Sequence, residues 1–216
     1  MKKTTWLAAC MAAVCALALV TGCSSETDEP DGIEYDAGKW LIEGRTVLRY
    51  TGTETDVQVP DGVTVIGKHA FESRTAVAHV KLPESVAMIG WYAFHGCESL
   101  TEVTIPDGVN TIGQNAFQNC KSLADVQIPG GVTEIGQYAF NSCSKLTTVA
   151  IPVSVESIGY DAFYCYNLAN VTYGGTQEQW DEIEKGWEIF YYNIKTITGK
   201  DGSFTVDRNG NIIDSE

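Results

Sequence analysis

The chain contains a unit in which apolar and polar residues alternate before a proline and a turn. Starting at Leu100, one copy reads LTEVTIPDGVNTIGQNAFQNCKS. Val103 and Ile105 alternate with Glu102 and Thr104, which is the period-two pattern of a strand with one buried face. This part of the unit therefore predicts a short strand whose polar residues face solvent.

The rest of the unit predicts a turn, a second extended piece and a short helical turn. Pro106 ends the strand because it has no amide hydrogen to donate to a ladder, and Asp107 with Gly108 supplies the turn. Ile112 and Gly113 close a second extended piece. Apolar residues at helix-like offsets then indicate a short helical turn that brings the chain back round: Ala116, Phe117, Cys120 and Leu123.

The unit recurs at a constant interval. Prolines stand at positions 60, 83, 106, 129 and 152, and phenylalanines at 71, 94, 117, 140 and 163, so every step has the same length. A fixed period of about 23 residues is typical of a solenoid, in which each coil leaves apolar groups that only a neighbouring coil can bury. We therefore expect coils stacked about 4.8 Å apart, with a column of phenylalanine rings in the shared core.

The segments on either side of the repeats predict caps. Residues 39–56 predict a β-hairpin that turns at Glu43 and Gly44, and its apolar side chains are expected to cover the first coil: Leu41, Val47 and Leu48. Beyond residue 175, apolar residues at helical spacing predict a segment that covers the last coil: Trp180, Ile183, Trp187 and Phe190. Asn209 and Gly210 lie between two β-like runs and predict a terminal hairpin.

The repeated motif is I-P-x-x-V-x-x-I-G-x-x-A-F-x-x-C-x-x-L, seen best at residues 105–123 and 128–146. Over residues 57–175 the chain resembles the BspA-like leucine-rich repeats of bacterial surface proteins. The resemblance implies a leucine-rich repeat solenoid of α/β-type coils, with a parallel sheet on its concave side and short helical turns. We expect five repeats, each of about 22–23 residues. They lie between the N-terminal hairpin and a mixed C-terminal cap with a hairpin tail at residues 176–216.

The first residues predict a targeting segment. Lys2 and Lys3 precede a mostly apolar run that ends in VTGC, which resembles a bacterial lipobox. This resemblance implies that residues 1–22 are a lipoprotein signal peptide and that Cys23 is lipidated; an ordinary secretory signal is the alternative. Residues 23–38 are acidic and poor in apolar groups, which predicts a disordered tether. We therefore expect the domain in the cell envelope, outside the cytoplasm and attached to the membrane only through its lipid.

Net charge limits the partners of the domain. The chain has 14 basic and 28 acidic residues, and loss of residues 1–22 removes two lysines, which leaves a net charge of −16. Such an acidic surface is repelled by phosphate groups. We therefore expect no binding of nucleic acid and no binding of anionic lipid by the folded part.

Residues with reactive side chains form no catalytic or metal-binding pattern. Four of the seven cysteines lie in the repeats, where their recurring position predicts buried free thiols rather than disulfides or a zinc site: Cys97, Cys120, Cys143 and Cys165. His69, His79 and His95 occupy different repeat positions, with no nucleophile at a meaningful spacing. A faint calcium-loop pattern at residues 207–211 lacks the required glycine and glutamate. We therefore predict no enzyme activity, no metal and no cofactor.

Function is then expected on exposed residues that the repeat leaves free to vary. Polar and small residues point out of the predicted concave sheet: His79, Lys81, Glu102, Thr104, Asp125, Gln127, Thr148, Ala150, Asn170 and Thr172. A second group forms an aromatic edge beside the Ala-Phe pair of each coil: Trp91, Tyr92, Tyr138, Tyr160, Tyr164 and Tyr166. Exposed aromatic rings on a rigid frame suit both protein hot spots and stacking on sugars. Solubilising variation and edge packing are the alternative explanations.

Together these features predict a non-enzymatic surface lipoprotein that binds an extracellular protein of a host or of a neighbouring cell. The resemblance to BspA-like proteins implies adhesion, but a solenoid frame does not dictate its ligand. A carbohydrate-binding module that uses the aromatic edge is one alternative. A structural or accessory lipoprotein of an envelope complex is another.

Overall fold

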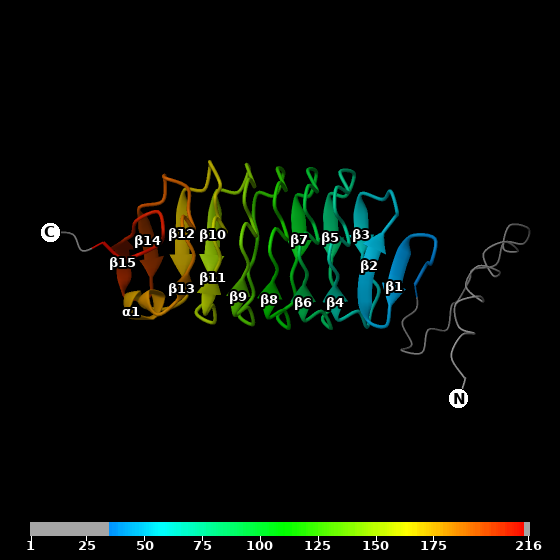
Figure 1. The fold of residues 1–216 in the computed structure, drawn as a ribbon, viewed down its shortest axis with the longest axis horizontal. Coiled ribbons are helices and arrows are strands. Elements are labelled where there is room, and N and C mark those ends of the chain that lie inside the picture. Colours follow the sequence, from blue (N-terminus) through cyan, green and yellow to red (C-terminus); the bar gives the residue numbers. More distant parts are fainter. Residues whose placement is uncertain (1–34, 214–216) are drawn as a thin grey trace, which may run out of the picture.

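The computed structural model describes residues 35–213, which form a β-solenoid of about seven turns. The coils stack side by side along one long axis, and the two described ends of the chain lie at opposite ends of the stack (Figure 1). Each coil has three walls, two made of strands and one made of turns. The solenoid of repeating coils that the period predicts is confirmed.

The first wall contains the first strand of each unit, which is followed by a proline up to residue 152, and it continues into the C-terminal strands. Its pairing is parallel between neighbouring coils, except for the antiparallel pair β14 and β15 at the C-terminal end. An isolated parallel bridge between Gln127 and Ala150 lies between its two sheets. The three-stranded sheet contains β3 (Asp56–Gln58), β5 (His79–Lys81) and β7 (Glu102–Thr104). The four-stranded sheet contains β10 (Thr148–Ile151), β12 (Asn170–Tyr173), β14 (Thr196–Gly199) and β15 (Gly202–Thr205).

The second wall is the sheet with the most strands. Most of these strands come from the second extended piece of each unit. Successive isoleucines pair one coil apart, as Ile89 does with Ile112 and Ile112 with Ile135. Only β1 and β2 are antiparallel. In spatial order the eight strands are β1 (Trp40–Glu43), β2 (Thr46–Tyr50), β4 (Val65–Ile66), β6 (Met88–Ile89), β8 (Thr111–Ile112), β9 (Glu134–Ile135), β11 (Ser157–Ile158) and β13 (Glu184–Lys185).

The third wall is not helical, which corrects the expectation of short helical turns. The amide of Phe94 donates to the carbonyl oxygen of Ala116 in the next coil (2.7 Å), whereas the amide of Ala93 donates to Gly90 in its own coil (3.3 Å). In each coil, a residue close to the alanine, such as Tyr92 (φ 58°), is left-handed. Because left-handed residues interrupt an α-helix, the wall is a series of tight turns. Within residues 35–213 the only α-helix is α1 (Gln177–Asp181), which lies outside this wall's repeated turns.

A column of stacked aromatic rings fills the core. Five phenylalanines are fully buried, and their ring centroids lie 4.8–5.3 Å apart with nearly parallel planes: Phe71, Phe94, Phe117, Phe140 and Phe163. The column continues to Tyr50 at the N-terminal end (5.2 Å) and to Phe190 at the C-terminal end (6.0 Å). Each ring is therefore packed between rings of the two neighbouring coils.

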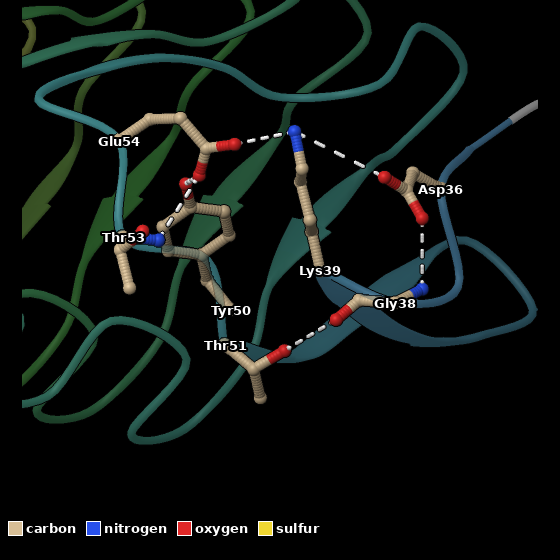
Figure 2. Close-up of polar contacts among 7 residues, drawn as sticks. All are labelled: Asp36, Gly38, Lys39, Tyr50, Thr51, Thr53 and Glu54. Atoms are coloured by element: carbon tan, nitrogen blue, oxygen red, sulfur yellow. Dashed lines mark hydrogen bonds and ion pairs between the residues drawn. The ribbon is translucent and has the colours of Figure 1, made fainter.

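At the N-terminal end, β1 and β2 pair as a hairpin that contributes alternate residues to the core. Trp40, Ile42 and Val47 are buried, whereas Leu41 and Leu48 are 55% and 37% exposed and do not cover the first coil. Lys39 on β1's N-terminal side and the hydroxyl of Tyr50 both bind the carboxylate of Glu54, which also accepts the amide of Thr53 (Figure 2). These contacts lower the pKa of Glu54 to about 2, with the hydrogen bond from Lys39 as the largest cause.

At the C-terminal end, the stacking continues past residue 175. After α1, the sequence EKGWEIF adds strand β13 and places Phe190 on the aromatic column, so another coil lies where a cap was expected. Trp180 is fully buried, but Trp187 is 75% exposed, which corrects its assignment to the core. A tight antiparallel turn around Asn209 and Gly210 then closes on the core, because the carbonyl of Gly210 accepts the indole N–H of Trp180 (2.8 Å).

Candidate binding surfaces

The sheet face, defined as the outward side chains of the first wall, is the first candidate surface. Each strand of the three-stranded sheet alternates an exposed, a buried and an exposed residue. The candidates expected on the concave sheet are all exposed there: His79, Lys81, Glu102, Thr104, Asp125, Gln127, Thr148, Ala150, Asn170 and Thr172. They vary in charge and size from coil to coil, whereas the buried residues between them are mostly valine.

The N-terminal part of the sheet face is hollowed. An open depression of about 430 Å³ is lined by polar side chains of three coils: Asp56, Gln58, His79, Lys81, Glu102 and Thr104. Nδ1 of His79 lies 2.7 Å from Oδ1 of Asp56. The pKa of Asp56 is lowered, first by the hydroxyl of Thr55 and then by His79. Sequence reasoning missed Asp56 and Gln58, although they precede His79 and Lys81 by one full repeat.

The aromatic edge divides into separate groups. Trp91 is 56% exposed, with Nζ of Lys68 5.8 Å from the centroid of its ring. Tyr92 stacks on His69, with ring centroids 5.0 Å apart. Farther along the stack, Tyr138 and Tyr160 meet edge to face, with centroids 5.1 Å apart. The predicted edge is thus not one continuous aromatic surface.

A tyrosine cluster at the C-terminal end joins two predicted residues to two that sequence reasoning missed. Tyr191 packs against Tyr164 and Tyr166, with ring centroids 4.8 Å and 4.7 Å away, and against Tyr192 at 5.3 Å. Arg208 donates a hydrogen bond to the hydroxyl of Tyr192 (3.2 Å). The signal for Tyr191 was its place directly after Phe190, the same place that Tyr164 has after Phe163.

The four repeat cysteines are free, buried thiols that each donate a hydrogen bond to a backbone carbonyl. Sγ of Cys120, for example, lies 3.2 Å from the carbonyl oxygen of Phe94. Burial raises the pKa of Cys97 to about 12 and raises those of Cys120 and Cys143 well above the usual value. Because the thiolate is the reactive form of cysteine, this column packs the core and provides no nucleophile.

The histidines show a local cluster without a metal-binding geometry. Nδ1 of His69 lies 2.9 Å from one carboxylate oxygen of Glu72, and Nδ1 of His95 lies 3.4 Å from the other. Over residues 35–213, no three His, Cys, Asp or Glu side chains converge as a metal site. The helix found in that same part of the chain is too short to cross a membrane.

Stacked coils with a leucine-rich repeat signature and side chains displayed on open walls define a leucine-rich repeat protein. The chain belongs to the family described as the BspA type leucine rich repeat region, whose model matches six copies over residues 64–196. That is one copy more than the five repeats expected from the sequence. The family and its fold are typically non-enzymatic and surface-exposed. A search of curated proteins found no match.

Solved structures of bacterial leucine-rich repeat proteins are similar. A leucine rich repeat protein of T. pallidum is 34% identical, with 64% of this chain and 71% of that chain covered and a TM-score of 0.59. A leucine rich cell surface protein of Faecalibacterium prausnitzii is also 34% identical, with 70% of this chain but only 40% of that chain covered and a TM-score of 0.62. The pneumococcal vaccine antigen PcpA shares the fold at 17% identity, over 79% of this chain and 42% of its own (TM-score 0.57).

Proposed function

We propose that this protein is a lipid-anchored surface protein whose sheet face binds an extracellular protein of a host or of a neighbouring cell. The observation that carries the proposal is the sheet face itself: non-repeating, exposed side chains stand in columns on a repeating, buried frame. The family's typical exposure at the cell surface supports the same conclusion. The similar protein of F. prausnitzii is described as a cell surface protein.

The physical argument rests on preorganisation of the sheet face. The strands of the first wall pair in register with their neighbours in the next coil, so their outward side chains keep fixed positions. A surface that is already ordered loses little conformational entropy when a partner binds. The depression carries groups of both kinds: His79 lies between Asp56 and Glu102 in one column, and Lys81 lies in the neighbouring column between Gln58 and Thr104. Such a pattern selects a partner of complementary charge.

A charge reversal on the sheet face tests the proposal. The full chain, purified in mild detergent, is applied to an array of purified extracellular matrix proteins. We expect Glu102→Lys with Asp125→Lys to lower the affinity for a bound matrix protein at least tenfold. The matched control, Asp61→Lys with Asp107→Lys, changes the net charge equally at exposed turns outside the sheet face and should bind normally. Equal losses in both double variants would contradict the proposal.

The membrane anchor is a separate part of the proposal. Cys23 and the signal peptide lie outside the described residues, so the support for lipidation is the VTGC motif after an apolar run. Several acyl chains on one cysteine give a stable anchor, because each buried methylene contributes about 0.8 kcal/mol. Cys23→Ala should abolish lipid labelling and release the protein from the membrane fraction. Normal processing and membrane attachment of that variant would show that the anchor is not on Cys23.

A further inference from the structure

The corner between the second and third walls is a line of glycines. One glycine of each coil stands there, directly after the isoleucine or lysine that ends the strand: Gly67, Gly90, Gly113, Gly136, Gly159 and Gly186. A Cβ atom on Gly159 would lie 2.4 Å from the backbone nitrogen of Gln137 in the preceding coil, and one on Gly186 would lie 2.4 Å from that of Tyr160. Side chains are therefore excluded from this corner, and its floor is bare backbone.

In the C-terminal half of the stack, this corner is a groove of about 330 Å³ that crosses three coils. Glu134, Ser157 and Glu184 form one side, and they are direct neighbours because Ser157 pairs with both glutamates. Gln137 and Tyr160 lie on the other side, after the glycines. The groove thus has a polar side and a partly aromatic side above a backbone floor.

Trp187 lies just beyond the residues that line the groove. It directly follows Gly186, as Tyr160 directly follows Gly159, so the two rings belong to successive coils about 4.8 Å apart. Trp187 is 75% exposed, and no aromatic partner stacks on it within residues 35–213. A large, flat ring that is open to water beside a groove offers a face on which a ligand ring can stack.

Charges in the groove favour a ligand that donates hydrogen bonds. Glu134 and Glu184 are exposed and take part in none of the ion pairs formed by residues 35–213. Nζ of Lys185 is occupied, because it donates to the carbonyl oxygens of Trp180 (2.9 Å) and Ile183 (2.8 Å). The free groups are therefore carboxylates, which accept hydrogen bonds and repel anions.

The backbone of the groove argues against an extended peptide as the ligand. A peptide strand binds by adding to an unpaired sheet edge, but β11 pairs with β9 on one side and with β13 on the other. The lining also contains no row of exposed aliphatic side chains that would hold a helix. A chain of sugar rings needs neither, because it stacks on aromatic rings and donates hydroxyl groups.

We propose that the glycine-floored groove binds a linear, neutral polysaccharide, with sugar rings stacked on Tyr160 and Trp187 and hydroxyl groups donated to Glu134 and Glu184. The spacing of one coil is close to the length of one sugar unit, so consecutive sugars meet consecutive coils. This site lies on other walls than the sheet face, and it goes beyond the proposed protein-binding function rather than resting on it.

Affinity electrophoresis of the full chain in mild detergent tests the site. The gels contain one of three linear neutral polysaccharides (mixed-linkage β-glucan, xylan or glucomannan) or the anionic polygalacturonate. We expect at least one neutral polymer, and not polygalacturonate, to retard the protein. Trp187→Ala should weaken this retardation at least tenfold, and Glu134→Gln with Glu184→Gln should weaken it as well.

Trp91→Ala is the matched control, because Trp91 is also an exposed tryptophan directly after a corner glycine, but that glycine, Gly90, belongs to a coil that the groove does not cross. It should bind like the unchanged protein. Glu102→Lys with Asp125→Lys should also keep the polysaccharide affinity, which separates this site from the sheet face. Retardation by no neutral polymer, or equal losses in Trp187→Ala and Trp91→Ala, would overturn the proposal.

Discussion

Replacement of Phe117 by alanine measures how much of the stability resides in the aromatic column. Phe117 is fully buried between Phe94 and Phe140, with ring centroids 5.1 Å and 5.2 Å away and planes within 4° of parallel. The substitution removes two stacked contacts and leaves a cavity that the rigid coils cannot close. A buried Phe→Ala change typically costs about 3–5 kcal/mol. Each kcal/mol corresponds to about 2–4 °C in a chain of this size, so the melting temperature should fall by roughly 6–20 °C.

The assay for Phe117→Ala is urea unfolding followed by circular dichroism, with Phe117→Leu as the control. Leucine keeps most of the apolar volume but loses the stacking, so its loss of unfolding free energy should be clearly smaller. A solenoid is stabilised by contacts between neighbouring coils, and a weakened middle coil should therefore also reduce cooperativity. A loss below about 1 kcal/mol for Phe117→Ala, the size of an ordinary substitution, would refute the view that the column dominates the core.

Three further predictions follow from backbone contacts, buried thiols and the N-terminal network. A Cβ on Gly131 would lie 2.2 Å from the carbonyl oxygen of Asp107, whereas a Cβ on Gly130 would meet nothing within 4 Å. In thermal melts, Gly131→Ala should therefore lower the free energy of unfolding by about 1–3 kcal/mol, and Gly130→Ala should leave it almost unchanged. A thiol reagent should label none of the four repeat cysteines before unfolding and all four after it, so labelling of the native protein would contradict their burial. The pKa of Glu54 falls from 4.5 to about 2 on folding, so its stabilising contribution is complete above pH 4.5 and is lost as the pH drops toward 2. Between these pH values the melting temperature should fall more steeply in the wild type than in Glu54→Gln, and parallel curves would rule out this role.

The strands and the core could be predicted from the sequence because each depends on a pattern that repeats. Val103 and Ile105 alternate with polar residues, and the position of Phe117 holds phenylalanine in every repeat, so burial follows directly from position. The third wall could not be predicted in the same way. Its turns need a left-handed residue in each coil, and Tyr92 or Asn115 occupies that place instead of glycine. The amides of Tyr92 and Asn115 donate to the carbonyl oxygens of Gln114 and Gln137 in the next coil, and such contacts cannot be read from one repeat alone.

The last coil was missed because an insertion changes its spacing. Phe190 follows Phe163 at a longer interval than separates the other phenylalanines of the column, since α1 lies in the connection before β13. In the sequence, Trp187 is at helical spacing from Trp180, and this spacing led to its assignment to the core. Alignment on the glycine instead of the phenylalanine reveals the coil, because Gly186-Trp187 matches Gly159-Tyr160.

The two proposed surfaces differ in how each is built. On the sheet face, outward side chains cover the backbone. A substitution at Glu102 can therefore change the binding surface while the packing of the buried neighbour Val103 stays the same. Surface changes of this kind usually alter stability by less than about 0.5 kcal/mol, and the specificity of this face is therefore free to change. The glycine corner allows no such freedom, because any side chain there strikes the preceding coil. Its floor stays the same as the coils vary, and only flanking residues such as Trp187 and Glu134 can set what it binds.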